Sequence, residues 1–234
     1  MESKSKGFGN IDVPEQYLDL LEIIENKIDH TAHDLDHLIR VYQLSLVIAK
    51  NESDIDWEVL IPAVFLHDIA RKIEDNDSTG LVDHALLGAS MAEEILKNLH
   101  YESPRIEKIK HCIASHRFRG ALPPQTKEAQ ILYDADKLDV LGAVGIARSF
   151  MLVGIHGERI FRDISLEDYK KENVGLNGKI KDLSKHASNL EYELKLKKIP
   201  QKLFTPQAKE IARQRLEVMR NFFEILECEI KGLR

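Results

Sequence analysis

WEVLIPAVFLHDIAR, residues 57–71, is an apolar segment with the spacing of a buried helix. Asp56 precedes it, and aspartate is among the residues that cap helix N-termini. Val64 and His67 lie on one face of such a helix, and Asp68 lies beside that face, four residues after Val64. The segment therefore predicts a helix that packs in a core and ends on two adjacent titratable side chains.

Helix signals recur on both sides of this segment. Two expected helices begin with a cap residue followed by proline, Ser103-Pro104 and Thr205-Pro206, and the fixed φ of proline suits the first helical turn. Asp83 and Thr126 are the expected caps of two more. The expected helices span about residues 14–28, 34–50, 57–67, 84–96, 103–116, 126–151 and 205–229. No segment shows the alternation of a strand, so we predict an all-α fold.

The chain is expected to form a single domain. With 234 residues it can bury one sizeable hydrophobic core. We place that core at about residues 14–153 and a C-terminal helical extension at about residues 154–234. Residues 154–187 hold several glycines and many charges, which is typical of a mobile flap or an insertion.

The composition limits the classes of function. With 43% apolar and 31% charged residues, the chain resembles ordinary soluble globular proteins. Its net charge of −6 argues against an extended nucleic-acid surface, which needs a basic excess. Cys112 and Cys228 lie in separate segments without the spacing of a zinc knuckle, and no apolar run reaches the length of a membrane span. We therefore expect a cytoplasmic protein without membrane contact. The sequence leaves open whether the protein forms a homodimer.

Three of the expected helices place side chains of metal-ligand type on inward faces: His37, the pair His67-Asp68, and Asp136. Burying a lone carboxylate costs several kcal/mol, and Asp136 lies in a segment with few other charges. Each residue alone is more simply explained as a hydrogen-bonded core side chain or a salt-bridge partner. Their joint pattern favours a divalent ion. Mixed imidazole and carboxylate ligands suit Mn²⁺, Fe²⁺, Co²⁺, Ni²⁺ or Zn²⁺, with Mg²⁺ as a further candidate.

The order of these residues, H…HD…D, resembles the signature of the HD superfamily of metal-dependent phosphohydrolases. The resembling motifs are HDLDHLIRV (33–41), FLHDIAR (65–71) and ILYDADKLDVLGAVGIAR (131–148). TPQAKEIARQRLEVMRNFFEIL (205–226) further resembles the tail of a subgroup of small single-domain HD hydrolases. In that subgroup the last aspartate ligand precedes a Lys-Leu or Arg-Leu pair, which selects Asp136 over Asp134.

The resemblance implies an HD-domain helical bundle around a divalent ion held by His37, His67, Asp68 and Asp136. It also implies hydrolysis of a nucleotide or a related phosphate ester or anhydride, such as the release of pyrophosphate from a nucleoside triphosphate. In such a reaction the ion polarises the phosphate and makes water a nucleophile at neutral pH. Asp68 would accept a hydrogen bond from that water. A diiron oxygenase on the same fold and a non-catalytic, metal-stabilised binding module are the alternatives.

Three further histidines are candidates for catalysis. His33, His84 and His116 could serve as general acid–base groups or as phosphate contacts. The positions of His84 and His116 also resemble HD subfamilies in which extra histidines bind a second metal. The remaining histidines lack such a context and are expected at the surface: His100, His111, His156 and His186.

Three cationic residues are candidates for substrate binding. Arg71 and Lys137 adjoin the expected ligands in sequence, and Arg148 shares the expected helix of Asp136. Cationic groups beside a metal ion would neutralise the charge of a phosphate. Salt bridges to acidic residues are the alternative for each of them.

Overall fold

The computed structural model describes residues 12–27, 32–117, 122–175 and 178–233, and of residues 27 and 32–34 it describes the backbone only. These residues form helices and no strand, apart from two isolated β-bridges, so the all-α prediction is confirmed. The chain divides into two compact units, Met1–Asp136 and Lys137–Arg234. The single domain with an extension from about residue 154 stays a prediction.

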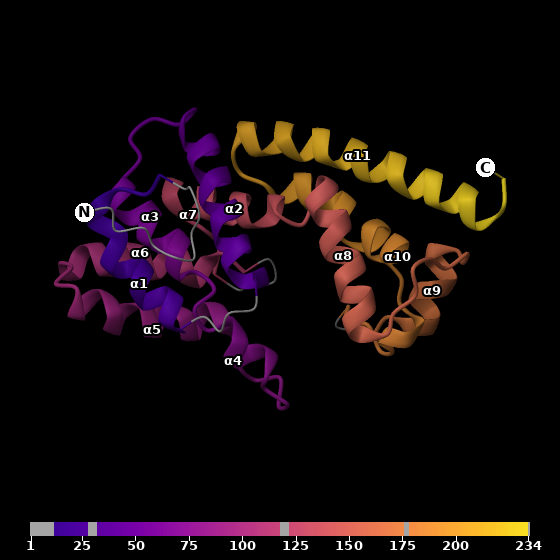
Figure 1. The fold of residues 1–234 in the computed structure, drawn as a ribbon, viewed down its shortest axis with the longest axis horizontal. Helices are drawn as coiled ribbons and strands as arrows, with labels where there is room; N and C mark the ends of the chain where they lie inside the picture. The colour runs from indigo at the N-terminus through magenta and orange to yellow at the C-terminus, as the bar shows by residue number, and fades with distance from the viewer. Residues whose placement is uncertain (1–11, 28–31, 118–121, 176–177, 234) are drawn as a thin grey trace. The chain divides into compact units, whose positions relative to one another are not determined.

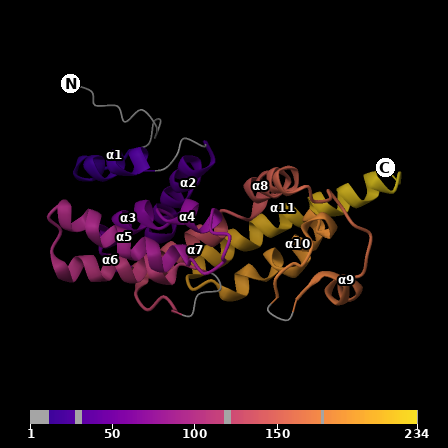
Figure 2. The same cartoon turned by 90° about the horizontal axis from the view of Figure 1, so that it is seen from below.

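Helices fill the N-terminal unit (Figure 1). In chain order they are η1 (Glu15–Tyr17), α1 (Leu18–Lys27), α2 (Ala32–Ala49), α3 (Trp57–Leu66), α4 (Arg71–Asp75), α5 (His84–Asn98), α6 (Ser103–Ser115) and α7 (Lys127–Leu138), whose last two residues belong to the second unit. α5 and α6 lie side by side in Figures 1 and 2. α3 packs on α1, α2 and α6, and the short α4 packs on α5.

α3 forms the core of this unit, as its apolar sequence predicts. All residues from Val59 to Leu66 are buried. Phe65 stacks on Tyr42 of α2, with the ring centroids 5.0 Å apart. Each such apolar side chain gains about 1.5–3 kcal/mol from burial. Because α3 ends at Leu66, its buried end carries His67 and Asp68 directly into the interior of the unit.

The predicted caps Asp83 and Thr205 are confirmed, whereas Ser103, the expected cap of α6, is the first residue of that helix, after Glu102. The Asp83 side chain accepts hydrogen bonds from backbone N–H groups in the first turn of α5, so this helix begins at His84. Asp56 precedes α3, but its side chain makes no cap hydrogen bond. Its Oδ2 atom lies 3.4 Å from Lys108 Nζ instead. The position of the α3 start is therefore correct, while the expected capping bond is wrong.

The prediction of one helix over about residues 126–151 is wrong, because the helix is interrupted between the end of α7 and the start of α8 (Gly142–His156). Gly142 has φ +75°, in the left-handed region that favours glycine. A Cβ atom at Gly145 would lie 2.1 Å from the carbonyl oxygen of Val140, so the first turn of α8 also requires glycine. The apolar spacing runs through this break, which is why the pattern predicted a continuous helix.

The C-terminal unit continues from α8 with α9 (Leu166–Asn173), η2 (Leu183–Lys185), α10 (Ser188–Leu194), η3 (Leu196–Lys202) and α11 (Pro206–Ile230). α11 packs on α8 and η3, and α10 packs on α8 and α9 (Figure 2). Thr205 caps α11 as predicted, since its side chain accepts a hydrogen bond from the Ala208 N–H. Phe150 of α8 meets Phe222 of α11 edge to face, with centroids 5.6 Å apart.

The described residues of segment 154–187, expected as a flap or an insertion, belong to the C-terminal unit and contribute to its buried core. Tyr169 lies in a buried apolar cluster, and its hydroxyl group lies 2.7 Å from His186 Nδ1. His186 Nε2 lies 3.4 Å from Glu191 Oε2. The prediction that His186 lies at the surface is wrong, because these two partners satisfy the ring inside the unit, where it is 4% exposed.

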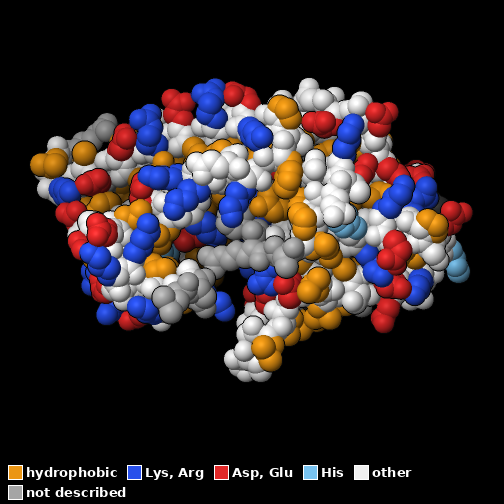
Figure 3. All heavy atoms as spheres, turned by 180° about the vertical axis from the view of Figure 1, so that it is seen from behind, with side chains coloured by type: hydrophobic (Ala, Val, Ile, Leu, Met, Phe, Trp, Pro, Cys, Tyr) orange, Lys and Arg blue, Asp and Glu red, His pale blue; other side chains and the backbone are white. Residues whose placement is uncertain are grey.

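The surface of the described residues carries positive and negative side chains side by side. On the face seen in Figure 3, Lys and Arg side chains are interspersed with Asp and Glu side chains over both units. Among the helices that the structure describes, none is by itself long and apolar enough to cross a membrane. Only α7 and α8 taken together would meet that requirement, by length and composition alone.

Candidate metal centre

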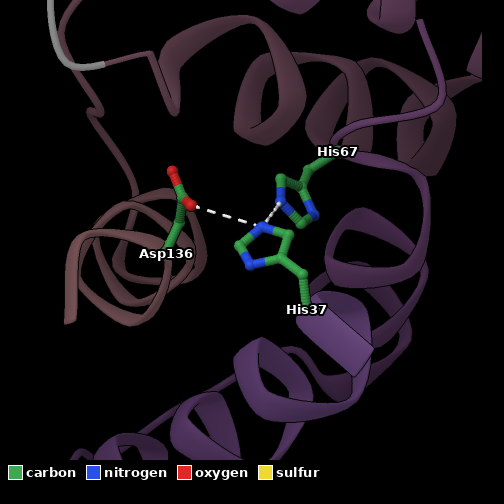
Figure 4. A group of neighbouring side chains, drawn as sticks. All are labelled: His37, His67 and Asp136. Carbon is green, nitrogen blue, oxygen red and sulfur yellow. Dashed lines mark hydrogen bonds and ion pairs between the residues drawn. The ribbon is translucent and has the colours of Figure 1, made fainter. Parts of the chain in front are cut away.

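Three helices of the N-terminal unit bring predicted ligand side chains together. His37 lies on α2, His67 follows directly after α3, and Asp136 lies near the end of α7. His37 Nε2 lies 3.3 Å from His67 Nε2 and 3.5 Å from Asp136 Oδ1, so His37 stands between the other two (Figure 4). In the described part of the chain these three side chains form a group with metal-ligand geometry, and it does not include the buried Asp134.

Asp68 uses its two carboxylate oxygens differently. Oδ2 lies 3.5 Å from His37 Nε2 and 3.7 Å from His67 Nε2. Oδ1 lies 3.5 Å from Nε2 of both His84 and His116. The structure thus brings all four predicted metal ligands and two of the three candidate catalytic histidines to one site.

His84 and His116 form a second pair beside the first. His84 opens α5 and His116 follows directly after α6, and their Nε2 atoms lie 3.2 Å apart. Both residues are buried. His67, Asp68 and His116 form the other group with metal-ligand geometry among the described residues. Asp68 and His67 are therefore shared between two possible ion positions.

Three of the imidazole rings have their Nδ1 atom engaged by an acceptor. His67 and His116 each direct Nδ1 at the carbonyl oxygen three residues earlier, at 2.7 and 2.6 Å. A carbonyl oxygen cannot donate, so Nδ1 carries the proton in both rings. His84 directs Nδ1 at the carboxylate oxygen Oε2 of Glu74, 2.7 Å away. In the neutral ring the lone pair is then on Nε2, the atom that each ring directs into the site.

Burial keeps the rings of His67 and His84 neutral. It lowers the pKa of His67 to about 4 and also lowers the pKa of His84, in both cases against the attraction of Asp68. Burial opposes the ionisation of Asp68 as well, but His67, His116 and His37 outweigh it and hold the pKa of Asp68 well below its ordinary value. At neutral pH the site therefore combines the neutral rings of His67 and His84 with the ionised carboxylate of Asp68.

The spacing and chemistry of these donors fit a divalent ion. Donor atoms bound to one ion at about 2.0–2.2 Å lie roughly 3–3.5 Å apart. The neighbouring donor pairs given above lie 3.2 to 3.7 Å apart, and all donors of each group lie within 4.8 Å of one another. The Nε2 lone pairs of His84 and His116 face each other, which is repulsive until a cation or a proton lies between them. The side chains of Asp68 and Asp136 are 22% and 14% exposed, so a bound ion would be accessible to water and substrate.

Two other candidates in the N-terminal unit lie close by in sequence. Arg71 opens α4, three residues after Asp68, and its half-exposed side chain pairs with Glu74 and Asp75. The His33 side chain lies outside the described residues, although its backbone belongs to α2. Their roles in substrate binding and catalysis stay predictions.

Lys137 and Arg148 belong to the C-terminal unit. Arg148 pairs there with Asp139, whose side chain is buried. This contact agrees with the salt-bridge alternative for Arg148. A role for either residue in phosphate binding rests on the sequence alone and stays a prediction.

Sequence analysis missed Glu74 and Arg117. Glu74 lies in the charged run RKIEDND (71–77), which has the pattern of a solvated helix face. In the structure its Oε2 atom meets His84 and its Oε1 atom lies 2.8 Å from Arg117 Nη1. Because these contacts connect α4, α5 and the end of α6, no helical periodicity predicts them.

The HD-domain family model matches residues 34–141, the range in which the converging histidines and aspartates lie. Residues 34–141 form an HD domain. This domain extends from α2 through α7, so the motifs HDLDHLIRV, FLHDIAR and ILYDADKLDV all contribute to it. The resemblance to the HD superfamily that these motifs predicted is confirmed.

Several known proteins resemble the chain over most of its length. The uncharacterised YpgQ protein of Bacillus subtilis is 28% identical over 209 residues, which make up 88% of this chain and 88% of that protein. The crystal structure of an HD-superfamily hydrolase from Bacillus thuringiensis matches with a TM-score of 0.66 and 25% identity, over 93% of this chain and 96% of that one. The crystal structure of YpgQ in complex with ADP matches with a TM-score of 0.67 and 24% identity, over the same shares. The chain thus shares its helical fold with both solved structures over most of their length.

Proposed function

We propose that this HD domain is a metal-dependent phosphohydrolase that acts on a nucleotide or a related phosphate ester or anhydride. The convergence of His37, His67, Asp68 and Asp136 from three helices carries this proposal. The two carboxylates are partly exposed, which suits a catalytic ion with open positions better than a closed structural site. The likeness to an HD-superfamily hydrolase supports hydrolysis as the reaction type.

Each side chain in the site would have a separate role. The four ligands would hold the ion, which when bound supplies Lewis-acid polarisation of the phosphate and activation of water. Asp68, ionised at neutral pH, would accept a hydrogen bond from the attacking water and orient it. His84 and His116 direct Nε2 acceptors towards Asp68 Oδ1, so they can take up a proton as general bases. Arg71 would neutralise charge on the phosphate.

A nucleotide is the substrate class that we propose. The related YpgQ protein has been crystallised in complex with ADP, a nucleoside with two phosphates. A divalent ion together with the cationic Arg71 would suit a polyphosphate, because both neutralise its charge. We therefore propose nucleoside di- and triphosphates as the first substrates, with release of pyrophosphate from a triphosphate as the expected anhydride cleavage.

A hydrolysis screen tests this proposal. The full-length chain is incubated with nucleoside mono-, di- and triphosphates and with cyclic dinucleotides, each with added Mn²⁺, Co²⁺, Ni²⁺ or Mg²⁺. Metal-dependent release of phosphate, pyrophosphate or a mononucleotide from one of these classes is expected, and a chelator should abolish it. Absence of product with every metal and every substrate would contradict the proposal.

The second histidine pair favours one alternative function. Asp68 Oδ1, His84 and His116 could complete a two-ion centre, which a diiron oxygenase on this fold requires. Metal analysis of the purified chain distinguishes the two functions. One exchangeable ion of Mn²⁺ type with phosphate release supports the hydrolase, whereas two tightly held irons without phosphate release support the oxygenase. A bound metal without turnover of any substrate supports the non-catalytic binding module.

A further inference from the structure

A carboxylate behind the site holds one of its histidines. Glu74 Oε2 lies 2.7 Å from His84 Nδ1. Glu74 belongs to α4 and His84 opens α5. The two side chains are 17% and 5% exposed, so water competes little for this hydrogen bond.

Arg117 holds the other oxygen of the same carboxylate. Its Nη1 atom lies 2.8 Å from Glu74 Oε1 and 2.8 Å from Asp83 Oδ2. The contact with Glu74 is an ion pair whose angle lies outside hydrogen-bond geometry. Asp83 caps the helix that His84 opens, and Arg117 follows His116 in the chain. One arginine therefore connects the segments that carry both histidines.

We propose that Glu74 is a positioning residue that fixes His84 as the Nδ1–H tautomer and aims its Nε2 lone pair at Asp68 and His116. A ring held in this way presents an acceptor, which can take a proton from water or bind a cation. The other tautomer would present an N–H group at the same place. Carboxylate–histidine pairs of this kind orient the ring and raise the basicity of its inward nitrogen. The effect on turnover rests on the proposed function, whereas the tautomer is a property of the metal-free chain.

The isosteric variant Glu74→Gln separates positioning from packing. Arg117 and Arg71 can only donate, and Arg117 lies 2.8 Å from the Oε1 position while Arg71 lies 3.6 Å from the Oε2 position, so the closer Arg117 attracts the amide oxygen of the new side chain. The amide nitrogen then faces His84 and donates to it, so Nδ1 must accept. The ring proton consequently moves to Nε2. The variant is therefore expected to invert the His84 tautomer with almost no change in side-chain volume.

The experiment is ¹⁵N NMR of the histidine side chains in the full-length, metal-free chain near neutral pH, where protonated and unprotonated ring nitrogens are resolved. His84 should carry its proton on Nδ1 in the parent and on Nε2 in Glu74→Gln. In Glu74→Gln/Arg117→Met the amide is free to turn, and Nδ1–H should return. Glu93→Gln is the matched control, because Glu93 of α5 pairs with Lys97 and Lys110 outside the site and its loss should leave His84 unchanged.

Kinetics supply the second measurement. Glu74→Gln should lower kcat about 10–100-fold with a smaller change in KM, as expected for a group that acts through another residue near the metal. A parent His84 with Nε2–H, or a Glu74→Gln variant that keeps Nδ1–H, would overturn the assignment of Glu74. If the variant does not fold, the parent spectrum alone still shows whether His84 carries its proton on Nδ1, as the assignment of Glu74 requires. If the parent shows no hydrolysis, the proposed function fails, while the NMR result still tests Glu74.

Discussion

Asp68 directs its Oδ1 atom at His116, 3.5 Å from Nε2, while its Oδ2 atom faces His37 at the same distance. One carboxylate is therefore shared by the two histidine pairs of the site. The histidines around it hold its pKa well below the ordinary value, against the effect of burial. Asp68 thus contacts both histidine pairs, while His67 is common to both groups of metal-ligand geometry.

Replacing Asp68 by Asn is expected to weaken metal binding at both positions. The amide keeps the volume of the side chain but removes the negative charge, so the affinity for Mn²⁺ should fall by more than about 100-fold, beyond the loss typical of residues behind a metal site. Calorimetric titration of the metal-free chain with Mn²⁺ measures this. Asp75→Asn, an exposed carboxylate that pairs with Arg71, is the control and should bind Mn²⁺ as the parent does. An unchanged affinity in Asp68→Asn would remove Asp68 from the ligand set.

Two glycines of α8 should respond to alanine in opposite directions. A Cβ atom at Gly145 would lie 2.1 Å from the Val140 carbonyl oxygen, whereas Gly154 has open space around it. Gly145→Ala should lower the free energy of unfolding by roughly 1–3 kcal/mol, because the backbone must shift. Gly154→Ala should raise it by roughly 0.5–1 kcal/mol, because alanine favours the helix. Urea denaturation followed by circular dichroism measures both, and equal effects of the two substitutions would contradict the tight turn.

Glu191 should make the C-terminal unit sensitive to acid. Burial opposes ionisation of this carboxyl group, but the hydrogen bond from His186 and the charge of Lys195 outweigh it and lower the pKa of Glu191 to about 2. Because the pKa in the folded state lies below the ordinary value of 4.5, ionised Glu191 stabilises the unit above that pH. The stabilisation is lost as the pH falls from 4.5 towards 2.

Hydrogen exchange of the α10 amides tests this sign. In the parent, exchange should accelerate as the pH falls through that window, after correction for the intrinsic rate. Glu191→Gln carries no titratable group there, so its exchange should depend less on pH. The difference between the two chains isolates Glu191 from the other carboxylates. An identical pH dependence in both chains would show that Glu191 contributes nothing to acid stability.

Local signals predicted most of the helices and failed where the decisive contact is distant. The apolar face of α3 and the Asp83 cap are encoded within a few neighbouring residues, so the pattern located both. The break before α8 depends on the positive φ of Gly142, where a Cβ atom would also meet Arg215 of α11. No window around Gly142 contains that arginine, and the pattern therefore predicted a continuous helix.

The same distinction applies to the site. His37, His67 and Asp136 continue apolar stripes of their own helices, and these stripes predicted that they face inward together. Glu74 gave no such signal, because its role depends on His84 and Arg117 from other segments. Residues that bind the ion are thus easier to predict from local sequence than residues that orient them.

The most direct test of the proposed centre is the rate of product release by Asp136→Asn at matched Mn²⁺ concentration, with the nucleotide that the parent hydrolyses fastest. Asp134→Asn is the matched control, because Asp134 is buried two residues earlier on α7 and lies outside both groups of metal-ligand geometry in the described chain. Asp136→Asn should lose nearly all turnover, with a metal-free melting temperature no lower than that of the metal-free parent, because neutralising a carboxylate that is only 14% exposed removes a desolvation cost. Asp134→Asn should retain turnover. Full activity in Asp136→Asn would contradict a metal centre built on Asp136 and return Asp134 as the candidate ligand.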